Sequence, residues 1–246
     1  MKTLFDINGL CFWDEKEIRT RNYMIETFES EIKNILLKEN SAWKFHRMEA
    51  PLLNPSSLIN ANYTNEDIFV QENINNETTL VLRPETTPSS YVYAQHLLNS
   101  YITMPPFVVW QAGKSFRREQ DQVSKNMRLK EFYQQEFQCI YTKDTMNDYQ
   151  ENVLESIRKM LGNAIGLPTR IVESDRLPSY SLRTMDVEVD NGDKWMEVCS
   201  ISKRIDFPQN AVFQTKGKSI EKELFVLEIA IGLDRCVYNY INRLEK

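Results

Sequence analysis

Glycine is scarce in this sequence, and the glycine patterns that hold nucleotides are missing. Only 7 of the 246 residues are glycine, and neither G-x-G-x-x-G nor G-x-x-x-x-G-K-[ST] occurs. Such patterns place backbone N–H groups around phosphates. Any nucleotide site in this chain is therefore expected to be built from side chains.

Cysteine and histidine are also few. The four cysteines, Cys11, Cys139, Cys199 and Cys236, form no C-x-x-C pair, and only two histidines accompany them. This spacing is typical neither of a structural zinc site nor of a disulfide-rich secreted domain. The sequence therefore predicts a reducing compartment, and we expect a cytoplasmic protein.

No stretch has the composition of a signal peptide or of a membrane span. Acidic residues begin at Asp6 and Asp14, and the most apolar later run, LFVLEIAIGL, is interrupted by Glu228. A membrane-spanning helix needs about 20 consecutive apolar residues. We therefore expect no membrane partner.

Positive charge is not in excess. The chain has 30 basic and 35 acidic side chains, for a net charge of -5, and 41% of its residues are hydrophobic. This composition is ordinary for a globular protein and argues against broad attraction to a polyanion. A nucleic acid, if one binds, is expected at a restricted surface.

The chain does contain a mixture of helix and strand patterns, without repeats. Helices are expected at 15–39, from Pro88 to Leu98, at 148–161 with Gly162 and Gly166 as its end, and after Gly232. Strands are expected around 43–53, at 107–119 and 128–141, on both sides of Asn191-Gly192 and at 224–231, with loops over 60–76. Strands that are not separated by regular helices predict an α+β fold, here one domain over residues 1–246.

The stretch FRREQDQVSKNMRLKEFYQQEF, residues 116–137, predicts a nucleotide platform. Side chains alternate along a strand, so Arg117 shares a face with Glu119, and Arg128 shares a face with Phe132. A loop of roughly eight residues between the strands would bring the two faces together. Arginines bind phosphate oxygens, a carboxylate accepts from an amino group, and an isolated ring stacks on a base. The alternative is a solvated edge with salt bridges.

A second anomaly is Glu228, a lone carboxylate inside LFVLEIAI. Burying an unpaired charge costs several kcal/mol, so this residue must meet a cation, stay protonated or lie at the floor of a site. Arg235 follows about one helical turn beyond the strand. The pair predicts a place for an ammonium and a phosphate, and a buried structural ion pair is the alternative.

Together these residues resemble the class II aminoacyl-tRNA synthetases. FRRE followed by RLKEF is similar to motif 2 of that family, EIAIGLDR to motif 3, and WKFHRMEAPLL with Pro51 to motif 1. Within the class the resemblance is closest to glycyl-tRNA synthetase. LRPETTPS is similar to its RPETAQ segment, QAGKSFRRE to QIGxSFRNE, and WMEVCSISKRIDF to WxExxGIxxRTDYD, so the likeness runs from about residue 43 to 240.

The resemblance implies a class II synthetase-like antiparallel sheet flanked by helices, with ATP and an amino acid, most simply glycine, as substrates. In such enzymes the amino-acid carboxylate attacks the α-phosphorus of ATP, and positioning and charge stabilisation dominate catalysis. The implied catalytic residues are Arg117 and Arg235. The implied ATP-binding residues are Arg117, Glu119, Arg128, Phe132 and Arg235; those for the amino acid are Glu85, Glu136, Arg204, Glu228 and Ala230; and Glu197 would bind Mg²⁺.

By the same resemblance, Phe132 stacks on one face of adenine and Arg235 covers the other. A homodimer through the helix at 15–39 and the segment around Pro51 is also expected, because the apolar stripe of that helix would need a partner.

The sequence departs from the pattern of the glycine family at two points. Ala230 replaces a serine of the glycine family, which weakens the expectation of strict glycine selection. The sequence ends at Lys246, 11 residues after Arg235, so no anticodon-binding domain is expected.

Three functions follow from the sequence. The first is glycine activation and transfer to the acceptor end of tRNA. The second is activation followed by transfer to an acceptor other than tRNA, and the third is a non-catalytic accessory role on the same fold. Retention of Arg117, Glu119, Phe132 and Arg235 favours the two enzymes, because an accessory protein has no need of an ATP site.

Overall fold

The computed structural model describes residues 5–7, 9–59, 63–64, 66–70, 79–100, 102–118, 127–143, 149–175, 177–208, 210–215 and 218–244. Glu119 and most of the loop that follows it lie outside these ranges. Within them, none of the helices is long and apolar enough to cross a membrane. None of the four cysteines forms a disulfide, and three of them are buried.

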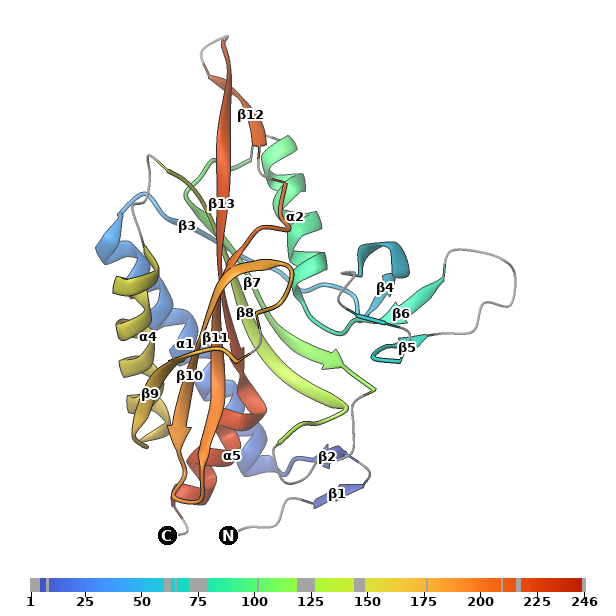
Figure 1. The fold of residues 1–246 in the computed structure, drawn as a ribbon, viewed down its shortest axis with the longest axis vertical. Helices are drawn as coiled ribbons and strands as arrows, with labels where there is room; N and C mark the ends of the chain where they lie inside the picture. The colour runs from blue at the N-terminus through green and yellow to red at the C-terminus, as the bar shows by residue number, and fades with distance from the viewer. Residues whose placement is uncertain are drawn as a thin grey trace.

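An eight-stranded sheet forms the body of the molecule, and its order is β3-β7-β8-β13-β11-β10-β9, with β12 paired to β13 (Figure 1). These strands are β3 (Lys44–Arg47), β7 (Phe107–Phe116), β8 (Glu131–Thr142), β9 (Thr169–Glu173), β10 (Ser181–Asp190), β11 (Trp195–Arg204), β12 (Asn210–Thr215) and β13 (Lys218–Gly232). Only β3 pairs in parallel, along β7; the other pairings are antiparallel. The predicted α+β class is confirmed.

Two small sheets lie beside this body. The strands β1 (Phe5–Ile7) and β2 (Leu10–Phe12) form a hairpin, and β4 (Leu53–Pro55), β6 (Leu80–Leu82) and β5 (Phe69–Val70) form a three-stranded sheet. A short 3₁₀ turn, η1 (Ser56–Leu58), follows β4. Figure 1 shows the three-stranded sheet as a lobe that extends away from the main sheet.

The main sheet is covered by helices on both faces. The helices α1 (Glu15–Glu39), α4 (Tyr149–Ile165) and α5 (Leu233–Arg243) pack on one face, and α2 (Thr87–Asn99) packs on the other (Figure 1). Along β7, Val108 and Trp110 join the first core, whereas Val109 joins the core under α2. Successive side chains of a strand therefore supply two different layers.

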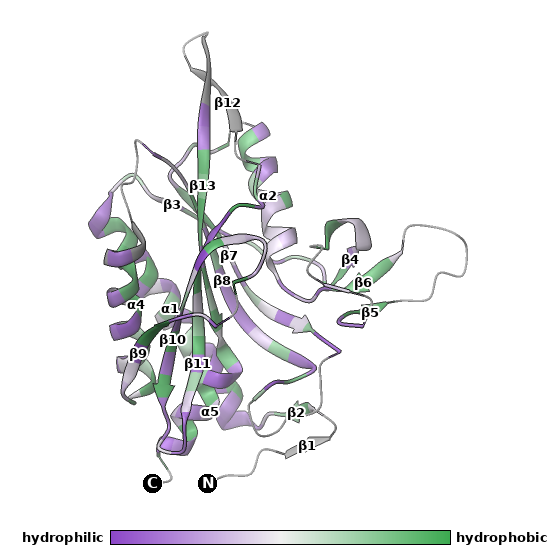
Figure 2. Ribbon diagram, in the orientation of Figure 1, coloured by the Kyte–Doolittle hydropathy of each residue, from purple (hydrophilic) through white to green (hydrophobic). Residues whose placement is uncertain are grey.

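The helix α1 buries its apolar stripe within its own chain. It begins with a capping box, in which Asp14 and Glu17 bond each other's backbone N–H groups. Met24, Phe28 and Leu36 are almost fully buried in the main core, and hydrophobic residues recur on one side of the helix (Figure 2). The argument that this stripe needs a second copy is therefore wrong, and the homodimer stays a prediction.

The paired strands β7 and β8 are shorter than predicted at the ends that face each other in the sequence. The strand β7 ends at Phe116 and β8 begins at Glu131, and these two residues are register partners. Arg117 and Arg128 therefore lie beyond the paired strands, and the predicted eight-residue loop is wrong. The connection spans residues 117–130, and a backbone hydrogen bond of 2.9 Å from Arg117 N to Lys130 O closes its base.

Two turn predictions had different outcomes. The hairpin at Asn191-Gly192 is confirmed, with Gly192 at a φ of 86° between β10 and β11. The predicted last residue of the third helix, Leu161, is wrong, because α4 continues through Gly162 to Ile165. The stop at Gly166, whose φ is 73°, is confirmed. Gly162 serves close packing instead, since a Cβ there would lie 2.9 Å from Thr169 Oγ1.

Replacing Phe28 with alanine should lower the free energy of unfolding by about 3–5 kcal/mol, because truncating a fully buried ring leaves a cavity. Urea unfolding followed by tryptophan fluorescence measures this change. Tyr23 lies on the same helix but is 67% exposed. Tyr23→Ala is the control and should change stability by no more than about 0.5 kcal/mol. Equal losses from the two variants would contradict the burial of the stripe.

Candidate active site

A cavity of about 270 Å³ opens on the α2 face of the main sheet. Nine of the predicted site residues line it: Glu85, Arg117, Arg128, Phe132, Glu136, Glu197, Glu228, Ala230 and Arg235. Arg204 lies behind this lining, and Glu119 lies outside the described residues. The structure thus brings together residues from segments that are far apart in the sequence.

The register of β8 and β13 explains why these side chains converge. Glu228 pairs with Gln138, Ala230 with Glu136, and Gly232 with Gln134. Alternate residues of both strands therefore point to the same face. Gly232 ends β13 and is the N-cap of α5, which brings Arg235 to the edge of that face.

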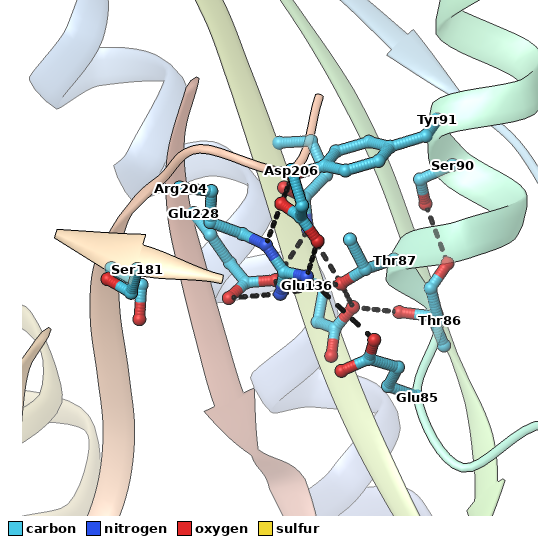
Figure 3. Close-up of polar contacts among 12 residues, drawn as sticks. Glu85, Thr86, Thr87, Ser90, Tyr91, Glu136, Ser181, Arg204, Asp206 and Glu228 are labelled. Carbon is cyan, nitrogen blue, oxygen red and sulfur yellow. Dashed lines mark hydrogen bonds and ion pairs between the residues drawn. The ribbon is translucent and has the colours of Figure 1, made fainter. Parts of the chain in front are cut away.

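Three carboxylates are buried at the inner end of the cavity. Glu85 precedes α2, Glu136 lies on β8 and Glu228 lies on β13 (Figure 3). Their exposed fractions are 3%, 3% and 4%. Buried ionised carboxylates are costly unless a cation or several hydrogen-bond donors meet them.

Arg204 is the cation that meets Glu228. Its Nη1 lies 2.8 Å from Glu228 Oε1 and 3.0 Å from Oε2, and its Nη2 lies 2.5 Å from Asp206 Oδ2 and 3.8 Å from Glu85 Oε1. Burial alone would lower the pKa of Arg204, but Glu228, Asp206 and Glu85 raise it, so the guanidinium stays charged. Among the alternatives left open for Glu228, the structure shows a buried ion pair, with Arg204 as the partner, and Glu228 also lines the cavity.

One guanidinium does not balance three buried carboxylates. Burial raises the pKa of Glu85, and it raises the pKa of Glu136 to about 8, with the nearby Glu228 and Glu85 adding to the second shift. Glu85 Oε1 is buried and accepts no hydrogen bond from the described residues. An excess of negative charge and an unsatisfied acceptor suit a small cation with several N–H donors.

Two threonines and a glutamine complete the carboxylate cluster. Thr86 and Thr87 both contact Glu136 Oε2 through their hydroxyls, and Gln138 Nε2 donates to Glu228 Oε1 at 2.8 Å. Sequence analysis missed these three residues as site residues. Their signal was present in the sequence, since both threonines follow Glu85 in RPETT, and Gln138 stands two residues after Glu136 and so shares its face of the strand.

Arg117 reaches the acidic cluster through Tyr63. Its Nη2 donates to the Tyr63 hydroxyl at 3.0 Å, and that hydroxyl donates to Glu85 Oε2 at 3.2 Å. The guanidinium carbon of Arg117 lies 5.3 Å from the centre of the Phe132 ring. Tyr63 was missed because it stands in an asparagine-rich stretch whose pattern indicates only a loop.

Arg235 and Glu197 form an ion pair at the opposite wall. Arg235 Nη1 lies 3.2 Å from Glu197 Oε2 and also donates to the Glu197 backbone oxygen at 2.9 Å. The Glu197 side chain is 45% exposed. Nearby Asp186 has a pKa raised to about 6, by burial and then by Glu197.

The described residues contain no group of three or more acidic, histidine or cysteine side chains placed to hold a metal ion. Mg²⁺ at a nucleotide is bound by one or two carboxylates together with phosphate oxygens and water. Glu197 therefore fits the ion only as a single ligand beside a bound nucleotide. Its role remains a prediction.

Arg83 holds the loop that carries Glu85, and sequence analysis missed it. Its side chain is 1% exposed; Nε donates to Lys114 O at 2.8 Å, and Nη1 donates to Ala50 O at 3.1 Å. The guanidinium lies against Gly113, where an added Cβ would be 2.4 Å from Nη2. A glycine at this point of β7 leaves room for the arginine.

The chain is similar to proteins of known family. A model of the tRNA synthetase class II core domain (G, H, P, S and T) matches residues 63–243. The glycine–tRNA ligase of Mycoplasma capricolum subsp. capricolum is 34% identical over 131 residues, which are 51% of this chain and 29% of the relative. That of Mesoplasma florum is 26% identical over 237 residues, 87% of this chain and 52% of the relative. The chain thus spans about half or less of these relatives.

Solved structures share the fold at low identity. A prolyl-tRNA synthetase from Cryptosporidium parvum, complexed with halofuginone and AMPPNP, superposes with a TM-score of 0.74 and 12% identity over 97% of this chain and 48% of that one. A structure described as the RNA binding domain of threonyl-tRNA synthetase from Cryptosporidium parvum Iowa II has a TM-score of 0.75 and 16% identity, over 98% and 69%. These likenesses concern the fold alone.

Replacing Arg204 with methionine should lower the free energy of unfolding by about 3–5 kcal/mol near neutral pH, because Glu228 then lies buried without its cation. The loss should shrink in acid. Arg204 lowers the pKa values of Glu85 and Glu136, which burial already raises. Without the guanidinium these folded-state pKa values lie still further above their unfolded values, so protonation relieves the penalty as the pH falls.

Urea unfolding at several pH values measures this effect. Arg183 is the matched control, because its partner Glu151 is exposed, and Arg183→Met should cost less than about 1 kcal/mol. A loss of stability in Arg204→Met that is the same at every pH would contradict the assignment.

Proposed function

The chain belongs to the family of class II tRNA synthetase core domains (G, H, P, S and T), and we propose that it joins glycine to AMP with ATP and passes the glycyl group to tRNA. The observation that carries the proposal is the cavity itself. Buried carboxylates line its inner end, and Arg117, Arg128 and Arg235 line the rest. An amino acid has an ammonium to match the first part, and ATP has phosphates to match the second.

The acidic end supports binding of the substrate ammonium. Glu85 Oε1 accepts no hydrogen bond from the described residues, and Glu136 is the carboxylate without a guanidinium partner among them. Three N–H donors of an ammonium suit these acceptors. With its nitrogen there, the substrate carboxylate extends toward Arg117.

The arginine-lined end supports ATP binding. Phe132 offers a ring for the adenine, and Arg235 at the start of α5 is the proposed cover on its other face, while Arg128 and Arg235 serve the terminal phosphates. We keep Glu119 as the proposed acceptor of the adenine amino group. Mg²⁺ would neutralise phosphate charge, with Glu197 as its protein ligand.

The proposed reaction needs little covalent help from the protein. A carboxylate oxygen of the amino acid forms a bond to the α-phosphorus, the bond to the bridging oxygen breaks, and pyrophosphate leaves with that electron pair. Arg117 stabilises the negative charge that gathers on the α-phosphate oxygens. Binding both reactants in one cavity supplies the orientation.

Glycine is the proposed amino acid, for two reasons. The carboxylate cluster leaves little room for a substrate side chain, so larger residues would be rejected by clash. The relatives named above are glycine–tRNA ligases. Ala230 enlarges the pocket slightly relative to serine, so alanine is the competitor to test first.

Transfer to an acceptor other than tRNA and a non-catalytic role remain the alternatives to this proposal. A homodimer, the expected assembly, is also part of it. Exposed apolar side chains near β4 and β5, namely Leu52, Leu53, Leu58 and Val70, support an interface on the three-stranded lobe.

The folded protein should catalyse pyrophosphate exchange into ATP when glycine and Mg²⁺ are present, because adenylate formation is reversible. Measuring exchange with each of the twenty amino acids tests both activity and selectivity. Equal exchange with alanine would leave activation standing and remove the claim of glycine selectivity. No exchange with any amino acid would favour the accessory role, and adenylate formed without charging of any tRNA would favour the other acceptor.

Arg117→Ala should lower kcat by about 10²–10³-fold with a smaller change in KM for ATP, because its contact strengthens in the transition state. Phe132→Ala should instead raise KM for ATP by about threefold to tenfold, as expected from lost stacking. Steady-state exchange kinetics separate the two effects. Arg118, which is exposed and does not line the cavity, gives the control variant Arg118→Ala. Equal, mild effects at Arg117 and Phe132 would favour a solvated edge.

A further inference from the structure

The hydroxyl of Thr87 lies between two of the buried carboxylates (Figure 3). Its Oγ1 is 3.0 Å from Glu136 Oε2 and 2.7 Å from Glu228 Oε1. The hydroxyl of Thr86 also contacts Glu136 Oε2. Three oxygen–oxygen contacts at hydrogen-bond distance therefore join four side chains.

The number of protons in these contacts identifies the charge state. Each hydrogen bond between two oxygens needs a proton, and a hydroxyl carries one whereas an ionised carboxylate carries none. Thr86 and Thr87 supply two protons for three contacts. Gln138 Nε2 also donates to Thr87 Oγ1, at 3.1 Å, and to Glu228 Oε1. These are N–H bonds, so they supply no proton for the three oxygen–oxygen contacts. The third proton must come from a carboxyl group.

Glu136 is the carboxyl that carries it. Glu228 has both oxygens within 3.0 Å of the Arg204 guanidinium, which favours its ionised form. Glu136 has no ion pair with a described residue. It faces two like charges, Glu85 from the turn before α2 and Glu228 from β13, and two opposite charges, Arg204 from β11 and Arg83 from the segment before Glu85. Burial and these two like charges raise the pKa of Glu136 to about 8.

We infer that the empty pocket holds one proton on Glu136, and that the substrate ammonium displaces this proton when it binds. In the empty pocket Glu136 Oε2 donates to Thr87, and Thr87 donates to Glu228. On binding, the O–H bond of Glu136 breaks, the proton leaves through the cavity to solvent, and N–H groups of the ammonium take its place. The inference rests on the proposed function, because it takes an amino acid as the ligand.

Thr87 is then a positioning residue rather than a catalytic one. It links the carboxylate that receives the ammonium to the carboxylate that Arg204 already neutralises. The RPETAQ segment quoted above has alanine where this chain has Thr87, and this chain has Ala230 where serine is usual. Relative to that pattern, a hydroxyl is present at the start of α2 and absent from β13.

Proton release on binding tests the inference directly. Glycine binding is measured by calorimetry near pH 7 in buffers of different ionisation enthalpy, which gives the number of protons exchanged. We expect about one proton released per glycine, falling toward zero as the pH rises through 8, since Glu136 is then already ionised. Binding without proton release would overturn the inference while leaving the proposed function intact.

Infrared spectroscopy of the empty protein tests the proton without a ligand. The C=O stretch of a buried carboxylic acid should be present in the wild type, missing from Glu136→Gln, and lost on addition of glycine. A wild-type spectrum equal to that of E136Q would overturn the assignment. If the band is present but no amino acid binds, the proton on Glu136 stands, and both its displacement and the proposed function fail.

Thr87→Val and Thr87→Ser separate the hydroxyl from the shape of the side chain. Valine keeps the shape without the hydroxyl and should weaken glycine binding about tenfold or more, as expected for a lost hydrogen bond to a charged group, with ATP binding unchanged. Serine keeps the hydroxyl and should stay within about threefold of the wild type. Glycine binding by T87V equal to that of the wild type would overturn the role of Thr87.

Discussion

The buried carboxylates at the inner end of the cavity, two of which pair with the Arg204 guanidinium, constrain the rest of the structure. Glu228 stands inside a central strand, where an unpaired charge costs several kcal/mol. Arg204 reaches it from the end of β11 at 2.8 Å and is itself held by Asp206 and by the ring of Tyr180, 3.8 Å away. Because each group needs the others, the end of β11, the middle of β13 and the turn before α2 must all meet at one point.

The same two central strands build both the core and the site. On one face, Trp110 of β7 stacks on Phe137 of β8 with ring centres 5.4 Å apart. The neighbouring register pair, Gln111 and Glu136, points to the opposite face, where Glu136 lines the cavity. This alternation fixes the polar groups on a rigid platform, since a shift of register by one residue would turn carboxylates into the apolar core and apolar side chains toward the cavity.

The hydrogen-bond donors that hold the buried carboxylates are mostly uncharged, so the pocket keeps its excess of negative charge. Thr86, Thr87 and Gln138 hold the carboxylates without neutralising them, whereas a second buried arginine would remove the attraction for a cation. Arg83 is buried nearby, but it donates mainly to the backbone oxygens of Lys114, Ala50 and Pro51, and these bonds anchor the loop that presents Glu85. The protein therefore separates the cation that supports the loop from the carboxylates that await a ligand.

The sequence by itself determined the α+β class, most of the helices and strands, and nine of the residues that line the cavity, because hydrophobic periodicity and motif spacing are local properties. It did not determine the end of α4, the length of the loop after Phe116, or the burial of the α1 stripe against the sheet. Nor did it reveal Tyr63, Arg83 and Thr87 as neighbours of the site. Each of these depends on segments distant in the chain. The packing of Gly162 against Thr169, the burial of Phe28 and the hydrogen-bond partners of the Thr87 hydroxyl are set only once the strands have paired. Which residue neutralises Glu228 was likewise decided by tertiary structure, which placed Arg204 within reach of it and left Glu85 and Glu136 facing the cavity.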